Sequence, residues 1–310
     1  MTPRVTVVMP VFNGERFIGE AVASALASSF RDFEILVLDD GSTDGSLAAA
    51  RRAAGGDARL RTVRLPHGGV AAARNAGLRE ARGGLIANLD SDDVMLPERL
   101  ALQVAYLDSH PECVAVGGRS LVVDAAGTPL QVVGRLFTHL EIDAALLGGH
   151  GGSLGSDTAM FRKHTAQAIG GYEDKLTATG EDHDLWLRLA EVGRIANLPD
   201  VLTRYRVHDT NVSGGKDSQT RRLPVTLDNL ARAFERRRIT DRQPAKLPRP
   251  PIPRSEQWCD AGIVRYYSGN RIGALWRVLV AAALNPAAPA TRSALRLMMS
   301  KRAPVRVGAP

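Results

Sequence analysis

Three carboxylates stand within four residues at Asp90-Ser91-Asp92-Asp93, directly after the apolar run from Leu85 to Leu89. Like charges this close together repel one another unless a cation joins them. Mg²⁺ and Mn²⁺ are held in proteins by one or two carboxylates, with substrate phosphates and water completing the shell. The cluster therefore predicts a divalent-metal site, and an Asp-rich turn that caps the following helix is the alternative.

A second acidic cluster, Asp39-Asp40-Gly41-Ser42-Thr43-Asp44, also follows an apolar run. A carboxylate at a strand end can accept hydrogen bonds from a nucleobase or from ribose hydroxyls, as in dinucleotide folds. A plain turn with a Ser or Thr cap needs no ligand and is the alternative. The first turn, Pro10 to Glu15, lacks the G-x-G-x-x-G of a Rossmann site, and the chain contains no Walker A sequence, so nicotinamide cofactors and P-loop chemistry are disfavoured.

A third group, Glu181-Asp182-His183-Asp184, stands at the start of a helical pattern. A carboxylate in the first turn of a helix faces the positive end of the helix dipole, which favours its ionised form. Such a group can take a proton from an attacking hydroxyl, an effect worth about 10²- to 10⁴-fold in rate. Acidic residues are also common at helix starts for structural reasons alone. His208, which follows a strand, could add an imidazole ligand to a carboxylate-bound metal, and a structural role is the alternative.

The elements that must position these groups alternate along the first hundred residues, as β-branched runs separated by helical patterns. This alternation is typical of βαβ units and a mostly parallel sheet. Strands are predicted over 5–9, 33–38, 60–64 and 85–89. Ligands of open α/β sheets bind outside the carboxyl ends of the strands. The polar clusters after Met9, Leu38 and Leu89 should therefore converge at one edge.

Later segments break this alternation. After a helix over 97–109, strands are predicted at 114–118 and 121–124, and they make the sheet mixed. The glycine-rich stretch 148–153 predicts a mobile loop. A further strand is predicted over 158–161 and a further helix over 181–192. Five prolines among basic residues at 241–254 predict a linker or an extended wrap. Trp258 to Ser300 predicts two amphipathic helices separated near Asn285-Pro286. The fold class is thus α/β, a mixed sheet flanked by helices with a mainly helical basic C-terminal extension.

Composition is that of an ordinary globular protein, because 44% of the 310 residues are hydrophobic and 24% are charged. Two cysteines, Cys113 and Cys259, argue against a disulfide-stapled secreted fold. No apolar stretch reaches the roughly 18 residues that span a bilayer, and the N-terminus enters a strand-like run without the features of a signal peptide. We therefore expect a cytoplasmic chain.

The net charge of +7 comes from the residues after 215, where basic side chains far outnumber acidic ones. A tail that is both basic and apolar predicts peripheral docking on the inner face of an anionic membrane through Trp276, Leu279 and Leu284. Packing of these helices on the rest of the chain, or on the second subunit of a homodimer, is the alternative. No nucleic-acid-reading motif accompanies the charge, so nucleic acid is not an expected partner.

Taken in order, these motifs resemble family 2 glycosyltransferases of the GT-A fold. The matching segments cover about residues 4–213 and are Val8 to Glu15, Val37 to Asp44, Ala73 to Gly77, Leu89 to Asp93, Gly170 to Tyr172, Glu181-Asp182 with Leu185 to Arg188, and Tyr205-Arg206 with His208. The resemblance implies a GT-A (Rossmann-like) nucleotide-sugar-binding catalytic domain over residues 1–215. A basic, Pro-containing linker and an amphipathic helical region would follow over 216–310.

The resemblance also implies an activity and a role for each matching residue. The activity is an inverting, metal-dependent transfer of a sugar from a nucleotide diphosphate sugar, most directly a UDP-sugar. Asp182 would be the catalytic base with Glu181 beside it, and Trp186 and His183 would lie on the acceptor side. The Mg²⁺ or Mn²⁺ ion would bind Asp92, Asp90, Asp93 and His208. The nucleotide sugar would contact Pro10, Val11, Asn13, Glu15, Asp39, Asp40, Arg74, Asn75, Asp90 and Ser91.

Two departures from the family pattern refine this expectation. His183 stands where the family often has an aromatic residue, so the acceptor pocket should differ. The Q-x-x-R-W motif and the spanning helices of processive members are missing, so we expect addition of a single sugar, to a glycan or lipid-linked acceptor in cell-envelope or exopolysaccharide synthesis. The alternatives are a sugar-phosphate nucleotidyltransferase, whose Gly-rich basic N-terminal loop is missing, and a non-catalytic nucleotide-sugar-binding module.

Overall fold

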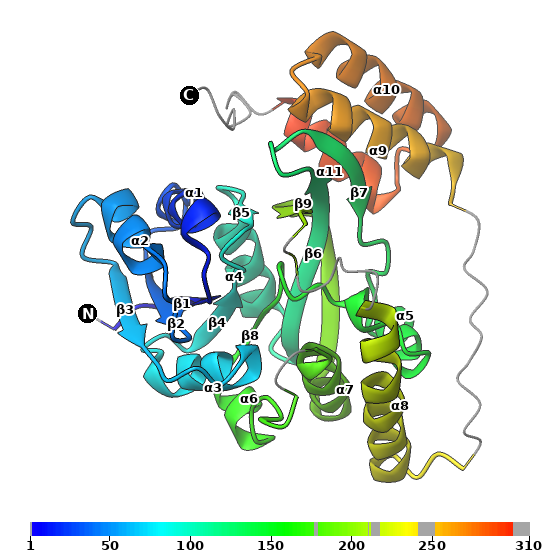
Figure 1. The fold of residues 1–310 in the computed structure, drawn as a ribbon. Coiled ribbons are helices and arrows are strands. Elements are labelled where there is room, and N and C mark those ends of the chain that lie inside the picture. The colour runs from blue at the N-terminus through cyan, green and yellow to red at the C-terminus, as the bar shows by residue number, and fades with distance from the viewer. Residues whose placement is uncertain (1, 177–178, 210, 212–217, 241–251, 300–310) are drawn as a thin grey trace.

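A computed structural model gives the structure of residues 2–176, 179–209, 211, 218–240 and 252–299. Within these residues, nine strands form one sheet. Its order is β3 (Leu60–Arg64), β2 (Phe33–Asp39), β1 (Val5–Val11), β4 (Leu85–Asn88), β8 (Met160–Arg162), β6 (Cys113–Val123), β9 (Arg194–Arg206) and β5 (Val94–Met95), and β7 (Pro129–Val133) pairs with β6 outside this path. Helices cover both faces of the sheet (Figure 1). The α/β class that the sequence predicts is confirmed.

The N-terminal half of the sheet is parallel and built from βα units. β1 pairs in parallel with β2 and with β4, and β2 pairs in parallel with β3. These elements are β1 (Val5–Val11), α1 (Glu15–Leu26), β2 (Phe33–Asp39), α2 (Ser46–Ala54), β3 (Leu60–Arg64), α3 (Val70–Glu80) and β4 (Leu85–Asn88). Each of the four predicted strands is confirmed to within two residues, and the carboxyl ends of these parallel strands lie at one edge.

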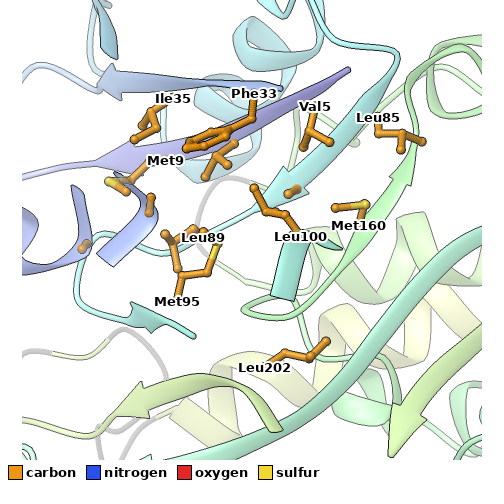
Figure 2. Close-up of a cluster of buried hydrophobic side chains, with 14 of the residues drawn as sticks. Val5, Met9, Phe33, Ile35, Leu85, Leu89, Met95, Leu100, Met160 and Leu202 are labelled. Carbon is orange, nitrogen blue, oxygen red and sulfur yellow. The ribbon is translucent and has the colours of Figure 1, made fainter. Parts of the chain in front are cut away.

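The inner strands β1, β2 and β4 are buried and mostly apolar because both faces of the sheet are covered there. On one face, Met9 packs in a cluster with Leu100 of α4 (Arg99–Ser109), as Figure 2 shows. On the other face, Val8 and Leu38 pack in a second cluster that includes residues of α3. Burial of each such side chain contributes roughly 1.5–3 kcal/mol. The two layers together fix the strand ends that carry the polar clusters.

The second half of the sheet is mixed, as predicted. β6 and β9 run parallel, whereas β8 is antiparallel to β4 and β6, and β5 is antiparallel to β9. The strands are β5 (Val94–Met95), β6 (Cys113–Val123), β7 (Pro129–Val133), β8 (Met160–Arg162) and β9 (Arg194–Arg206).

One correction concerns β6, which is a single strand where the sequence predicts two. Gly117 and Gly118 lie inside it, and a Cβ atom on Gly117 would come 2.3 Å from Asn197 Oδ1 of β9. Glycine inside a strand commonly marks such a close approach. The two glycines therefore allow tight packing and do not interrupt the strand.

Helices α7 and α8 pack side by side near the start of α7. The predicted helix over 181–192 is confirmed as α7 (Glu181–Val192), whereas α5 (His139–Leu147), α6 (Lys163–Ala168) and α8 (Ser218–Arg236) were not predicted. The predicted glycine-rich loop contains a short 3₁₀ turn, η1 (Gly151–Ser153).

A hydrogen bond joins α8 to the residue before α7. Asn229 Nδ2 of α8 donates to the carbonyl oxygen of Gly180 at 2.9 Å. Because Gly180 directly precedes α7, this bond ties α8 to the start of that helix.

The C-terminal part is helical, as predicted, but it contains three helices where the sequence predicts two. They are α9 (Arg254–Tyr267), α10 (Arg271–Leu284) and α11 (Pro289–Met299). Leu121 of β6, Val132 of β7 and Ile263 of α9 share one apolar cluster, and Asp260 of α9 forms ion pairs with Arg119 and Arg135. The helices lie beside β6 and β7 in Figure 1. The inner side of these helices therefore packs on the rest of the chain, as one of the two interpretations of the basic tail predicted.

The predicted division near residue 215 stays a prediction, and α8, α9 and α11 all contact elements that precede it. Most of the predicted proline-rich linker, 241–251, lies outside the described residues. Among the helices that the structure describes, none is both long and apolar enough to cross a membrane.

Candidate active site

Hydrogen bonds join two turns at the carboxyl ends of β1 and β2. The backbone N–H of Asn13 donates to Ser42 Oγ at 2.9 Å, and Asn13 Oδ1 accepts from the Thr43 N–H at 2.8 Å. Glu15 Oε2 accepts from the Gly45 N–H at 2.9 Å. Asn13 has a φ of +51°, in the left-handed region that Asn adopts more readily than most residues. Asn13 and Glu15 therefore join the two turns into one hydrogen-bonded unit.

Asp39 ends β2 opposite Val11, the last residue of β1, and Pro10 precedes Val11 in the same strand. The Asp39 side chain is buried, and its Oδ1 accepts from the Ser42 N–H at 2.9 Å. Its Oδ2 lies 3.6 Å from Nε of Arg64, whose side chain is 66% exposed. Asp39 is thus a buried carboxylate next to an exposed cation at the edge of the sheet.

Asp40 has both of its carboxylate oxygens engaged by the loop before α3. Oδ1 accepts from the Gly68 N–H at 2.8 Å, and Oδ2 accepts from the Gly69 N–H at 2.9 Å. His67 Nδ1 also lies 2.9 Å from Oδ2. Asp40 therefore orders this loop, and its predicted contact with a nucleotide stays a prediction.

Phe12 was missed by the sequence analysis. Its ring stacks on that of His67 with 4.3 Å between centroids, and both side chains are at least half exposed. An aromatic residue between the apolar run of β1 and the Asn13-Gly14 turn was the available signal. The pair presents a flat surface near Asp39 and Asp40.

Ser91 brings the acidic cluster after β4 to the turn after β1. A Cβ atom on Gly14 would lie 3.2 Å from Ser91 Oγ, so the Ser91 side chain lies against the backbone of Gly14. Asp90, next to Ser91, is only partly buried. The three clusters predicted to converge therefore share one edge of the sheet.

Arg74 of α3 joins two of the predicted sites. Its Nη2 donates to Asp90 Oδ1 at 2.8 Å, and its Nη1 donates to Glu181 Oε1 at 2.6 Å. The guanidinium group is almost completely buried, and it also lies over the ring of Tyr172. The acidic cluster after β4 and the start of α7 are thus held together by one side chain.

Burial and charge shift the pKa values of this group. Burial raises the pKa of Glu181 to about 7, and the nearby charge of Asp182 adds to the shift, while Arg74 opposes it. Although burial acts to lower the pKa of Arg74, the charges of Asp90 and Glu181 raise it above its ordinary value. Asp182 is partly exposed and accepts from the His183 N–H at 2.7 Å. Two adjacent carboxylates therefore have different surroundings, because Glu181 is buried against an arginine and Asp182 is partly exposed to solvent.

Asp92 lies against His208 at the end of β9. His208 Nε2 is 3.0 Å from Asp92 Oδ2, and Asn211 Nδ2 donates to the same oxygen at 3.1 Å. Burial and the charge of Asp90 raise the pKa of Asp92 above its ordinary value. The sequence separates these residues by more than a hundred positions, but the structure brings the predicted carboxylate and imidazole into contact.

Asp93 and Asp157 lie deeper than Asp92. Asp93 Oδ1 accepts from the Arg206 N–H at 2.8 Å, whereas its buried Oδ2 has no hydrogen-bond partner. Burial, together with the charges of Asp92, Asp157 and Asp90, raises the pKa of Asp93 well above its ordinary value. Burial also raises the pKa of Asp157 to about 6. Asp157, which precedes β8, was missed because it is a lone carboxylate in the sequence.

Three other predicted residues lie in the interior. Asn75 donates to the carbonyl oxygen of Tyr172 at 2.8 Å and accepts from its N–H at 2.9 Å, so it holds the turn before α7. His183 is buried, with Nε2 2.9 Å from the carbonyl oxygen of Leu146. Trp186 is fully buried against Phe161. The structure therefore gives no support to the prediction that His183 and Trp186 face an acceptor.

Solved structures show which fold this arrangement matches. S. aureus TarS in complex with UDP-GlcNAc aligns with a TM-score of 0.60 at 22% identity, covering 74% of this chain and 66% of that chain. The mannosyltransferase PcManGT from Pyrobaculum calidifontis, in complex with GDP-Man and Mn²⁺, aligns with a TM-score of 0.59 at 20% identity, covering 97% of this chain and 82% of that chain. The fold is therefore that of GT-A glycosyltransferases.

Sequence comparisons agree. The protein-family model described as glycosyl transferase family 2 matches residues 6–165. The putative glycosyltransferase EpsE of Bacillus subtilis is 34% identical over 212 residues, which are 66% of this chain and 73% of EpsE. The chondroitin synthase of Pasteurella multocida is 29% identical over 216 residues, which are 68% of this chain but only 21% of that enzyme, so the chain spans about a fifth of its length. The chain belongs to glycosyl transferase family 2.

Proposed function

We propose that the protein is an inverting, metal-dependent glycosyltransferase that adds one sugar from a nucleotide diphosphate sugar to a hydroxyl acceptor. The observation that carries this proposal is the pair of hydrogen bonds from Arg74 to Asp90 and Glu181. These bonds set the carboxylates that would face a leaving diphosphate beside the helix that carries Asp182. An inverting displacement needs both kinds of group at one anomeric carbon.

The donor would lie across the ends of β1 and β2. Asp39 would accept hydrogen bonds from the base or the ribose, and the exposed ring of Phe12 offers a face on which a base can stack. The turn formed by Asn13 and Glu15 would position the backbone around it. The UDP-GlcNAc and GDP-Man in the two neighbouring structures support a nucleotide-sugar donor, and we favour a UDP-sugar.

Asp92 and His208 suit a divalent cation, with Asp90 beside them. They place a carboxylate and an imidazole 3.0 Å apart, in a cluster whose mutual repulsion a cation would relieve. Among the described residues, no group of three His, Cys, Asp or Glu side chains is arranged to hold a metal ion, so the donor diphosphate and water would complete its shell. A bound Mg²⁺ or Mn²⁺ would supply Lewis-acid stabilisation of the leaving diphosphate.

Asp182 is the proposed base. It would accept the proton of the acceptor hydroxyl as that oxygen bonds to the anomeric carbon, while the bond from this carbon to the diphosphate oxygen breaks on the opposite face. The electron pair of the broken bond would leave with the diphosphate. Asp182 lies in the first turn of α7, near the positive end of the helix dipole. Glu181, held by Arg74, would be a positioning residue.

The acceptor and biological role are the broadest part of the proposal. We favour a glycan or lipid-linked acceptor in cell-envelope or exopolysaccharide synthesis. Relatives named chondroitin synthase and hyaluronan synthase support a polysaccharide product, although each is much longer than the matching part of this chain. The sequence lacks the Q-x-x-R-W motif of processive members, which favours addition of a single sugar.

A donor screen followed by product analysis tests this function. Thermal shifts measured with UDP- and GDP-sugars, each in Mn²⁺ or in EDTA, should single out one donor, because stabilisation grows as RT ln(1 + [L]/Kd). With that donor, NMR of the product should show an inverted anomeric centre. A retained configuration, or full turnover in EDTA, would contradict the proposal. Donor binding without any release of nucleotide would identify a binding module instead.

A further inference from the structure

One side of α10 is apolar and largely exposed, although the ring of Trp258 on α9 packs edge-on against Trp276 with 5.3 Å between ring centroids. The opposite side carries Ala274, Val278 and Ala281, which are buried. The apolar side exposes large residues, with Ile272 at 87% and Trp276 at 56% of their surface. Its members are Ile272, Leu275, Trp276, Leu279 and Leu284, here called the α10 outer face. The first four follow the i, i+3, i+4, i+7 spacing of a single helical stripe.

Around the α10 outer face, the acidic side chains turn toward the sheet and arginines remain near the exposed surface. Residues 252–299 contain six arginines and two acids. Both acids turn toward the sheet, because Asp260 pairs with Arg119 and Arg135 and Glu256 lies 4.0 Å from Arg135. Arg271 and Arg277 of α10 lie on either side of the stripe when 100° is counted per residue. The surface that this region presents to solvent is therefore apolar and basic.

A cavity of about 400 Å³ opens between β7 and the helices α9 and α10. Arg265 and Arg277 line it, and its one acid is Asp260, which is already paired with arginines. Arg277 thus belongs both to the cavity lining and to the border of the α10 outer face. Cationic side chains beside an exposed apolar stripe are the arrangement that a phosphate headgroup and its acyl chains require.

We propose that the α10 outer face docks the protein on an anionic phospholipid surface. A second copy of the chain fits less well, because a twofold interface would bring two basic borders together, and the acids of residues 252–299 turn toward the sheet and could not pair with them. Nucleic acid would match the charge but not the stripe of Ile, Leu and Trp side chains. Only a lipid surface satisfies both features, since the arginine stems can lie along the apolar layer while their charged ends reach the headgroups. Binding of vesicles requires no nucleotide sugar, so this inference stands apart from the proposed function.

Vesicle co-sedimentation of the full chain tests the proposal. We expect binding to vesicles of mixed phosphatidylcholine and phosphatidylglycerol, weaker binding at high salt, and little binding to phosphatidylcholine alone. Ile272→Glu and Trp276→Glu should each lower the partition coefficient about tenfold or more. Leu140→Glu is the matched control, because Leu140 on α5 is an apolar residue that is 79% exposed, and it should bind as the unaltered protein does.

Two further variants test how much the arginines contribute to vesicle binding. Arg271→Gln and Arg277→Gln should each lower binding to the anionic vesicles about fivefold, whereas Arg52→Gln on the exposed side of α2 should not. Light scattering without vesicles identifies the competing occupant: a dimer that Ile272→Glu dissociates would assign the face to a second copy and overturn the proposal. Equal binding to neutral and anionic vesicles, or no binding to either, would overturn it as well.

Discussion

Arg74 is the side chain on which the arrangement of the site depends. It is nearly completely buried, and its two Nη atoms hold carboxylates that lie 16 and 107 residues further along the sequence. A guanidinium group can satisfy two acceptors at once through its planar fork, whereas an ammonium group is a point charge. The identity of this residue therefore determines whether Asp90 and Glu181 are held together.

Arg74→Lys should fold but transfer sugar more slowly. Loss of one hydrogen bond to a charged group costs about 1.5–3 kcal/mol, so we expect a roughly ten- to hundredfold lower rate, measured as nucleotide release with the identified donor. Arg79→Lys, an exposed arginine on the same helix, is the control and should be neutral. A wild-type rate for Arg74→Lys would mean that the bridge has no part in transfer.

Glu181 should make the folded protein sensitive to pH. Its pKa is raised from 4.5 to about 7, so the folded state binds this proton more tightly than the unfolded state does. Stability should therefore fall as the pH rises from about 4.5 to about 7, by up to a few kcal/mol. Because Gln does not titrate, the stability of Glu181→Gln should not show this decrease with pH, whereas Glu235→Gln on the exposed side of α8 should still show it. Urea unfolding at mildly acidic and mildly basic pH measures the difference, and identical slopes for all three proteins would refute it.

At the scale of elements, the start of α7 is set by a glycine. Gly180 has a φ of +82°, and a Cβ atom there would lie 2.6 Å from Cγ1 of Val225 on α8. Gly180 also holds the Asn229 hydrogen bond through its carbonyl oxygen. The position of Asp182, two residues further on, thus depends on how α7 and α8 pack.

Gly180→Ala should lower both stability and the transfer rate. Left-handed backbone costs a residue with a Cβ atom about 1–2 kcal/mol, and the clash with Val225 should displace the start of α7. Gly170→Ala is a matched control, because Gly170 has a φ of +93° but nothing within 4 Å of its Cβ position. We expect a similar backbone cost in both variants by urea unfolding, but a rate loss only in Gly180→Ala. Equal rates in the two variants would show that α8 does not position the base.

The sequence predicts the elements whose burial pattern is simple. β1, β2 and β4 are covered on both faces, so each is a mostly apolar run. α5 was missed although Thr138 and Glu141 form a capping box at its start, a signal that can be read without a structure. Contacts between side chains that are distant in the sequence cannot be predicted in this way. That Arg74 meets Glu181, and that lone Asp157 joins the acidic cluster, follows from tertiary packing between distant segments, which residue type and spacing do not encode.

At the scale of the whole molecule, the three C-terminal helices are tied to the sheet by a buried charge. Arg119 of β6 is 1% exposed and pairs with Asp260 of α9, and Arg135 pairs with the same carboxylate. Arg204 of β9 also lies over the ring of Tyr267 at the end of α9. The α10 outer face is therefore fixed relative to the strand that leads to His208, so docking on a surface would orient the active site as well.

Asp260→Asn should loosen this attachment. The substitution removes the carboxylate that pairs with the buried Arg119, and breaking a buried pair in this way costs about 3–5 kcal/mol. Limited proteolysis should then cut α9 to α11 faster, and urea unfolding should show the loss of stability. Asp32→Asn, an exposed position before β2, is the control and should change neither. Unchanged proteolysis of Asp260→Asn would mean that the apolar cluster alone holds the helices.

The most direct test of the central claim compares donor binding with sugar transfer in Asp182→Asn. If Asp182 receives the acceptor proton at a site shared with the donor, this variant should bind the nucleotide sugar with unchanged affinity by calorimetry. Its transfer rate should fall by about 10²-fold or more, while Asp32→Asn matches the unaltered protein in both measurements. Transfer at the wild-type rate by folded Asp182→Asn would contradict the account.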